Sequence, residues 1–326
     1  MKKTRSLLLT LAVCLSLCAC GAEKVPSAPA ETETPTPTET VTPTEEITPA
    51  SVIRSAELQY PASNGLFKYS VYDTYVEITE YIGEPETDVV TVPGELEGLP
   101  VYVVKYDALD SCHADTIVFE EGIYQISCEI NDSVHVVLPS TLSSIEYGTF
   151  ENAYKLESVV IPEGVGGIGS RAFKHCSALK EVTIPSTVTW LSSEAFAFCS
   201  ALEAVSLPEG LRIIDSNAFT GCESLKTVQI PATVERIGAS AFSGSGLETL
   251  VIPETVQAVE EGLFAGCSKL KTLTVYNADL KIEPAEGYDF SLLFVECNPD
   301  LVVRGKVNST IAKQCAWENI FFEVIE

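Results

Sequence analysis

The sequence predicts a repeat solenoid of short parallel β-strands joined by turns or short helical segments. The prediction rests on three sets of residues that recur with one period of about 23 residues, and a shared period of this length is typical of stacked repeats. An apolar residue precedes proline at Leu138-Pro139, Ile161-Pro162, Ile184-Pro185, Leu207-Pro208, Ile230-Pro231 and Ile252-Pro253. The other two sets are phenylalanines at 150, 173, 196, 219, 242 and 264, and leucines at 156, 179, 202, 225, 247 and 270.

One period shows how a coil is built. Val182 and Ile184 alternate with Glu181 and Thr183, and this period of two predicts a short strand with one buried side. Pro185 ends the strand because it cannot donate to a hydrogen-bonded ladder. The chain then turns back toward the core.

The rest of the coil supplies the other inward side chains. Val188 and Leu191 are three residues apart and point inward, and Ala195-Phe196 begins a turn or short helical segment whose ring fills the wide part of the coil. Glycine follows some inward residues, as in Ile168-Gly169, where the chain must bend. A single coil cannot bury its own apolar edge, so successive coils must stack, with parallel strands about 4.8 Å apart.

The full pattern, L-x-x-V-x-I-P-x-x-V-x-x-I-G-x-x-A-F-x-x-C over residues 133–275, resembles the BspA-type leucine-rich repeat family of bacterial surface proteins. Residues 75–104 resemble the opening segment of that family and residues 301–322 its closing segment. The resemblance implies a leucine-rich-repeat-like solenoid and a role in surface adhesion or protein binding. It does not specify a ligand.

The domain organisation follows from the repeat and from the composition of its flanks. We expect a lipoprotein signal peptide at 1–19 and a lipidated cysteine with a disordered linker at 20–50. The solenoid then comprises an opening cap at 51–115, repeats at 116–275, and an irregular last coil with a closing cap at 276–326. The stack should be least regular at the short coil of residues 117–138, near Ser245 and over residues 271–300.

The N-terminus predicts export. Lys2, Lys3 and Arg5 precede an apolar stretch from Leu7 to Leu17 that is too short to span a bilayer well. The following Leu-Cys-Ala-Cys-Gly resembles a bacterial lipobox, which implies that Cys20 carries a diacylglycerol thioether and becomes the mature N-terminus. Plain secretion is the alternative. Lipid at this position would anchor the protein to the bacterial membrane with the solenoid facing outward.

Residues 21–50 predict a tether. They hold six prolines, eight threonines, six glutamates and no aromatic residue, a composition that cannot bury enough surface to fold. The same threonine and proline content is compatible with an O-glycosylated stalk. The whole chain has 20 basic and 46 acidic residues, a net charge of −26. That charge argues against nucleic acid and anionic lipid surfaces as partners, so the membrane should be reached through the N-terminal lipid only.

The sequence predicts neither an enzyme, a cofactor nor a metal site. The three histidines, His113, His135 and His175, stand near no known catalytic motif, and the mature chain has no C-x-x-C pair. Cysteines 176, 199, 222 and 267 share one repeat column, which favours a buried apolar ladder over disulfides or metal ligation. Bridges between Cys112 and Cys128 and between Cys297 and Cys315 stay open as alternatives.

Two outward surfaces are candidate binding sites. The outward strand positions from His135 to Thr274 contain one acidic residue, Glu181, in an otherwise acidic protein. A flat strip of low charge suits an interface, although threonine and valine are also simply good strand formers. The candidate contacts on this strip are Thr183, Thr227, Gln229, Thr249, Thr272 and Thr274.

The second surface is an edge formed by Trp190 and Ile213, which the period places outward on adjacent coils. An exposed tryptophan beside an exposed isoleucine is typical of an interface anchor, with partial burial under a neighbour as the alternative. Trp317, in the closing segment, should instead seal the end of the core.

These observations favour a monomeric surface lipoprotein that binds a protein or glycan on another cell, the matrix or the envelope. The alternatives are a structural envelope protein without a dedicated ligand and, less favoured, an accessory module of an enzyme system.

Overall fold

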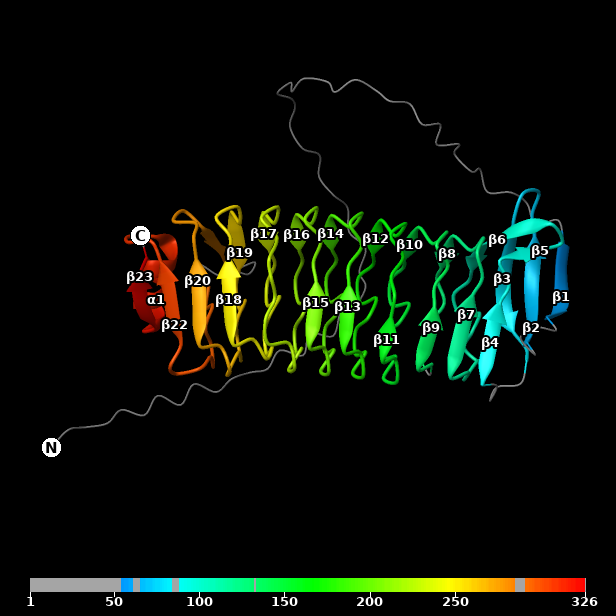
Figure 1. Ribbon diagram of the computed structural model, residues 1–326, viewed down its shortest axis with the longest axis horizontal. Coiled ribbons are helices and arrows are strands. Elements are labelled where there is room, and N and C mark those ends of the chain that lie inside the picture. Colours follow the sequence, from blue (N-terminus) through cyan, green and yellow to red (C-terminus); the bar gives the residue numbers. More distant parts are fainter. Residues whose placement is uncertain (1–53, 61–64, 84–87, 132, 285–290, 326) are drawn as a thin grey trace, which may run out of the picture. The chain divides into compact units, whose positions relative to one another are not determined.

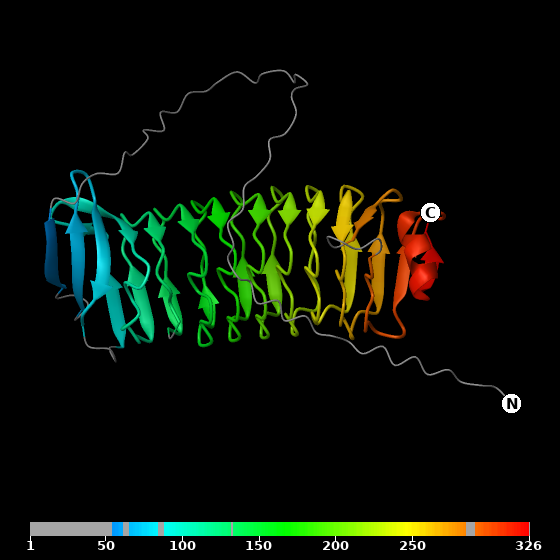
Figure 2. The same ribbon diagram turned by 180° about the vertical axis from the view of Figure 1, so that it is seen from behind.

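The computed structural model describes residues 54–60, 65–83, 88–131, 133–284 and 291–325. The predicted signal peptide, Cys20 and the predicted tether lie outside the described residues. The described chain forms a row of stacked coils in which each repeat adds one turn (Figure 1). Most coils contribute one short strand to each of two sides of the stack, as the opposite view also shows (Figure 2).

The first side is a single sheet that runs along the whole stack, and β5 (Glu95–Leu96) pairs with β6 beside this path. In spatial order its strands are β1 (Arg54–Tyr60), β2 (Gly65–Val71), β3 (Val76–Tyr81), β6 (Leu99–Val104), β8 (Gln125–Ile126), β10 (Ser144–Ile145), β12 (Gly167–Ile168), β14 (Trp190–Leu191), β16 (Ile213–Ile214), β17 (Arg236–Ile237), β19 (Ala258–Glu260) and β21 (Lys281–Glu283).

The second side consists of two shorter sheets. One holds β4 (Val89–Val92), β7 (Thr116–Phe119), β9 (His135–Val137), β11 (Ser158–Val159), β13 (Glu181–Thr183) and β15 (Ala204–Ser206). The other holds β18 (Thr249–Ile252), β20 (Thr272–Val275), β22 (Val302–Gly305) and β23 (Phe321–Val324). The coil between these two sheets pairs with β18 through an isolated parallel bridge from Gln229 to Val251.

The strand register confirms the period. Ser144 pairs with Gly167, and Trp190 pairs with Ile213, each exactly one repeat further along the chain. The short coil is also confirmed, because Thr116 pairs with His135, which follows it by less than a full repeat. The irregular last coil pairs Thr272 with Val302, which follows it by clearly more than a full repeat. Near Ser245 the step is one residue shorter than the period, because Arg236 pairs with Ala258. The pairing therefore departs from the period at all three places that the sequence singles out.

The core is built from ladders of identical side chains. The phenylalanine rings stack nearly parallel from Phe150 to Phe242, with centroids 4.8–5.8 Å apart, and the stack resumes from Phe264 to Phe294 at 6.0 Å. The cysteine column packs beside it. Each thiol donates to the phenylalanine carbonyl one coil before it, as from Cys199 Sγ to Phe173 O at 3.1 Å. The column is therefore a packed ladder, as predicted, and the eight cysteines that the structure describes are free thiols.

The two ends differ from the repeats. At the N-terminal end β1, β2 and β3 form antiparallel pairs before β3 joins β6 in parallel, an arrangement that the period does not reveal. At the C-terminal end the helix α1 (Thr310–Glu318) buries Ile311 and Cys315. The prediction that Trp317 seals the core is wrong: its side chain is 55% exposed, because it lies on the outer side of this helix.

Candidate binding surfaces

The threonine face is the outward side of the second row of strands, defined here by Thr183, Thr227, Gln229, Thr249, Thr272 and Thr274. The first four residues are exposed, as the alternation predicts. Thr272 and Thr274 are only half-buried rather than fully outward, because β22 lies directly beside them and places Val302 and Arg304 in register. The open part of this face therefore ends at β18.

Small side chains leave two shallow hollows in the threonine face. One, of about 590 Å³, is bordered by Val160, which directly follows β11, and by outward residues of β13 and β15, among them Thr183 and Ser206. The other, of about 440 Å³, lies between the coils that carry Thr227 and Thr249. A partner that presents convex groups could therefore pack against this face without displacing its side chains.

Charge is arranged along the borders of this face rather than on it. Among the described outward strand positions from β9 to β20, Glu181 is the single acidic residue. Just before the strands, acidic and basic residues alternate from coil to coil and pair along the stack, as in Lys180 with Glu157 at 3.1 Å and Lys271 with Glu248 at 2.8 Å. The hydrogen bond and charge of Lys271 lower the pKa of the Glu248 carboxyl.

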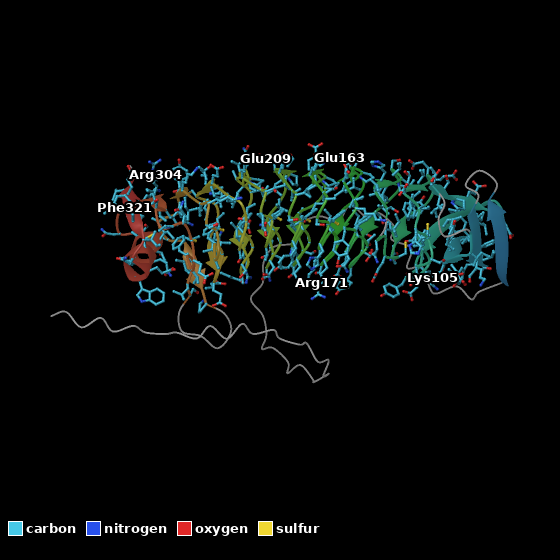
Figure 3. The ribbon with its side chains drawn as sticks, turned by 90° about the horizontal axis from the view of Figure 1, so that it is seen from below. Lys105, Glu163, Arg171, Glu209, Arg304 and Phe321 are labelled. Carbon is cyan, nitrogen blue, oxygen red and sulfur yellow. The ribbon has the colours of Figure 1, made fainter. Side chains whose placement is uncertain are left out.

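The charged part of the second row is at its C-terminal end. Arg304 on β22 pairs with Glu323 on β23 at 2.7 Å, and Figure 3 shows Arg304 and Phe321 at this end of the stack. The same view places Glu163 and Glu209 along one long side of the solenoid, and Lys105 and Arg171 along the other. The threonine face is therefore bounded by ionised groups beyond β20.

Trp190 and Ile213 lie in register on β14 and β16, on the other side of the stack. The Trp190 side chain is 54% exposed, whereas Ile213 is half-buried. The indole Nε1 donates to Asp215 Oδ2 at 3.2 Å, which fixes the ring on the side of the following coil. The pair is thus an exposed aromatic group beside a partly covered aliphatic one, rather than two equally exposed anchors.

Further aromatic residues on the same side were not identified from the sequence. Tyr102 stacks on Tyr124 at 5.5 Å, and Tyr75 lies 5.6 Å from Tyr102. Tyr75 and Tyr102 are further apart in the sequence than one repeat, and Tyr102 and Tyr124 are closer, so a search at the regular period does not align them. Tyr75 and Tyr124 directly precede β3 and β8, and Tyr102 lies within β6, so a search for aromatic residues in or just before the strands of this side would have found the tyrosine ladder.

A third feature lies on the turns that follow β12 and β14. Arg171 donates to the Tyr147 hydroxyl at 2.9 Å and to Glu194, which also pairs with Lys174. Burial raises the pKa of Glu194, but Lys174 and Arg171 outweigh it and hold that pKa below its ordinary value. Further along the same two turns, the rings of His175 and Phe198 stack with their centroids 4.8 Å apart.

His175 and Phe198 have left-handed backbones, with φ of 63° and 61°. The three following coils place glycine at this position, with φ from 63° to 72°. A bulky residue in this region is uncommon and costs about 1–2 kcal/mol. The turns at 175 and 198 therefore carry rings, a half-buried one at His175 and an exposed one at Phe198, where the three following coils use glycine.

The described residues show no group of three or more histidine, cysteine or acidic side chains that could hold a metal ion. Within the same ranges, no helix is long and apolar enough to cross a membrane. Burial raises the pKa of the Cys199 and Cys222 thiols, so these two cysteines lack the thiolate character of a reactive site.

Comparison with known proteins identifies the family. Matches to the BspA-type leucine-rich repeat region, in six copies, cover residues 102–223, 128–248 and 191–291, which together span more than half of the chain. The protein belongs to the BspA-type leucine-rich repeat family, as its repeat pattern predicts. The comparison with curated proteins gives no match.

Solved structures share the fold. A leucine-rich repeat protein from Bacteroides ovatus is 21% identical, with a TM-score of 0.57 over 82% of this chain and 77% of that one. The T. pallidum leucine-rich repeat protein is 24% identical, with a TM-score of 0.52 over 63% and 87%. A leucine-rich cell surface protein from Faecalibacterium prausnitzii is 19% identical, with a TM-score of 0.51 over 83% and 95%. At these identities the likeness establishes the solenoid and no more.

Proposed function

We propose that this protein is a non-catalytic, adhesin-like surface lipoprotein whose threonine face binds a protein or glycan on another cell, the matrix or the envelope. The observation that carries the proposal is the distribution of charge: one acidic residue lies on the open face of a chain with a net charge of −26. Burying such a face removes few ions from water, which keeps the desolvation cost of an interface low.

The chemistry of the threonine face suits a neutral polar partner. The hydroxyl groups of Thr183, Thr227 and Thr249 each donate and accept hydrogen bonds, and the hollows beside them accept small protruding groups. The ionised borders would repel or misalign partners of the wrong charge, because unpaired charges at an interface are costly.

Surface location is part of the proposal. It is supported by the lipobox-like sequence ending in Cys20 and by the description of the Faecalibacterium prausnitzii protein as a cell surface protein. Radioactive palmitate should label the wild-type protein and not a Cys20→Ala variant. Equal labelling of both would show that Cys20 carries no lipid.

The binding test uses residues 20–326 with Cys20→Ser, to keep the protein in solution. The wild-type protein should bind a component of partner-cell extracts or a matrix protein. A Thr227→Lys/Thr249→Lys double variant should bind the same partner at least tenfold more weakly. Two unpaired ammonium groups at the centre of the buried face would cost several kcal/mol. Both residues are exposed, so the thermal transition should not change.

The matched control is Thr255→Lys/Gln257→Lys. These two exposed residues precede β19 and lie off the threonine face, so the variant has the same net charge but leaves the proposed interface intact. Equal loss of binding in both double variants would trace the effect to overall charge and would reject the threonine face. Absence of any partner for the wild type would favour the structural envelope role.

A further inference from the structure

A hollow of about 270 Å³ lies on the first side of the stack, next to Trp190. Its floor is the backbone of the coil that precedes the tryptophan, from Gly166 to Gly169. The remaining walls are polar apart from the indole, because Ile145 and Ile168 are buried beneath the floor. The polar side chains that border it are Ser144, Glu146, Thr189 and Ser192.

The hollow exists because Gly167 has no side chain. In register with it, the neighbouring coils carry Ser144 on one side and Trp190 on the other, and every further position of this column from Gln125 to Ala258 has a side chain. A β-carbon added at Gly167 would meet nothing within 4 Å, and one at Gly166 would make only an ordinary contact at 3.9 Å. Neither packing nor backbone conformation requires these two glycines.

Gly169 shows the opposite case in the same coil. A β-carbon there would come within 2.7 Å of the backbone of Glu146 and Tyr147, so this glycine is required for close stacking of the coils. Glycine within a strand is less stable than alanine, because it loses more conformational freedom on folding. At Gly166 and Gly167 no close packing offsets this loss of stability. The effect of the two glycines is open space beside an exposed tryptophan.

The tryptophan is oriented toward this space. Its Nε1 donates to Asp215 Oδ2 on the following coil, so the ring is held from that side while its other side borders the hollow. The exposed indole is therefore restrained by this hydrogen bond at the border of the hollow. An aromatic face carries partial negative charge and attracts positively polarised C–H groups.

The polar rim is rich in acceptors. Ser144 Oγ donates to Glu146 Oε1 at 2.6 Å, and Ser192 Oγ donates to the Ile168 carbonyl at 2.6 Å. Both hydroxyls keep acceptor capacity toward the solvent, and the carboxylates of Glu146 and Asp215 add negative charge. A ligand for this rim must donate hydrogen bonds and must not be anionic.

From these observations we infer that the hollow between Gly167 and Trp190 binds one ring of a neutral or amino-bearing glycan. A sugar ring presents a face of C–H groups that stacks on the indole, and its hydroxyls or amine donate to Glu146, Ser144 and Ser192 at the rim. An apolar peptide side chain of similar size would contact the indole but leave the rim acceptors without donors. A lysine or arginine side chain could stack on the indole and donate to Glu146, but it donates from one end only, whereas the acceptors lie on two coils, with Ser144 and Glu146 on one and Ser192 on the other. A sugar ring presents donors around its whole edge, and failure of all three neutral or amino oligosaccharides would favour the cationic peptide instead. This inference relies on the proposed function only in treating the solenoid as a binding scaffold, and it does not depend on the threonine face.

The test follows Trp190 fluorescence in a Trp317→Phe variant, in which Trp190 is the sole tryptophan. The probes are chitotetraose, its de-acetylated amino form and cellotetraose, with a heparin tetrasaccharide as the anionic comparison. At least one of the first three should change the emission in a saturable way, and the heparin fragment should not.

The decisive variant is Gly167→Tyr, because tyrosine favours strands and its β-carbon would meet nothing within 4 Å at this position. It should fill the hollow and weaken binding of the responding oligosaccharide at least tenfold, with an unchanged thermal transition. Ala258→Tyr is the matched control, since it adds the same ring in the same register column further along the stack and should leave binding unchanged.

Three results would overturn the inference: no response to any neutral or amino oligosaccharide, binding that survives Gly167→Tyr, or a response to heparin alone. None of these depends on the threonine face, because the Thr227→Lys/Thr249→Lys variant tests a different surface. Loss of partner capture in that variant with normal oligosaccharide binding would separate the two sites.

Discussion

Between Phe150 and Phe242 each coil packs on neighbours built from the same residues, whereas the first and last coils pack on elements unlike a repeat. In the middle, burial is reciprocal, since each ring from Phe173 to Phe219 stacks on one before it and one after it. At the ends it is one-sided, because β1 to β3 and α1 cover an edge that no further coil covers. Stability should therefore be shared in the middle and local at the ends.

The largest effect should come from Phe196→Ala. The ring is fully buried and stacks on Phe173 and Phe219, so its removal should cost about 3–5 kcal/mol from lost transfer energy and the cavity left behind. Thermal or urea unfolding of the variant should show one destabilised transition that involves the whole stack.

Phe294→Ala is the comparison at the C-terminal end. Phe294 stacks on Phe264 only among the ring pairs of the described residues, so the same deletion should cost less and should loosen mainly the last coil in hydrogen exchange. If both variants lost the same free energy of unfolding, and hydrogen exchange rose along the whole stack in each, the distinction between middle and end would be wrong.

Glu318→Ala should have an intermediate effect that is confined to the C-terminal end. Its carboxylate accepts from the backbone N–H groups of Leu293 and Phe294 at 2.9 and 3.0 Å, and so ties α1 to the last coil. The free energy of local unfolding at this end should fall by about 2–3 kcal/mol, because the backbone donors are left without an acceptor. Amide hydrogen exchange of residues 291–325 measures this loss. Protection of the coils around Phe196 should not change, and a loss there would mean that the cap supports the entire stack.

The smallest effect should come from Glu194→Gln, which weakens an ionic link between coils in the middle. The free energy of unfolding of the variant should be about 1–2 kcal/mol lower at neutral pH, because Lys174 has little access to solvent and loses its charged partner. The pKa of Glu194 is lower in the folded state than its ordinary value of 4.5, so this stabilisation is present above that value.

As the pH falls through the lowered pKa of Glu194, the wild type should lose its advantage over the variant. Urea unfolding at a series of pH values from neutral to acidic measures this difference directly. A difference in unfolding free energy that stays constant down to low pH would show that the link is not ionic. A difference that grows as the pH falls would show that the pKa of Glu194 is raised rather than lowered in the folded state.

The inner half of each coil could be predicted residue by residue. Val182, Leu191 and Phe196 are all buried, as the pattern requires, since an apolar column that recurs once in every coil can only be buried by stacking. The short coil before His135 and the long one after Thr272 were located in the same way. The prediction worked because burial depends on each coil having the same shape as the next.

Outward positions were less predictable. Alternation placed Thr183 and Thr249 in solvent, but it placed Thr272 and Thr274 there too, where β22 partly covers them. Trp317 failed as a core residue because one turn of α1 decides which of its side chains face the stack. Neither outcome follows from a period, since both depend on elements outside the regular repeats.

The sequence by itself determined the solenoid, its register, its family and the residues that fill its core, because the free energy of burial acts on the same columns in every coil. The tertiary structure decided what the outside offers a partner: the hollows of the threonine face, the stacked tyrosines, and the space that Gly166 and Gly167 leave beside Trp190. Side chains on the surface meet neighbours from the adjacent coils, a whole repeat away in the sequence, and the room between them depends on the size of both. That is why a glycine in register with a tryptophan becomes a hollow only when the coils are stacked.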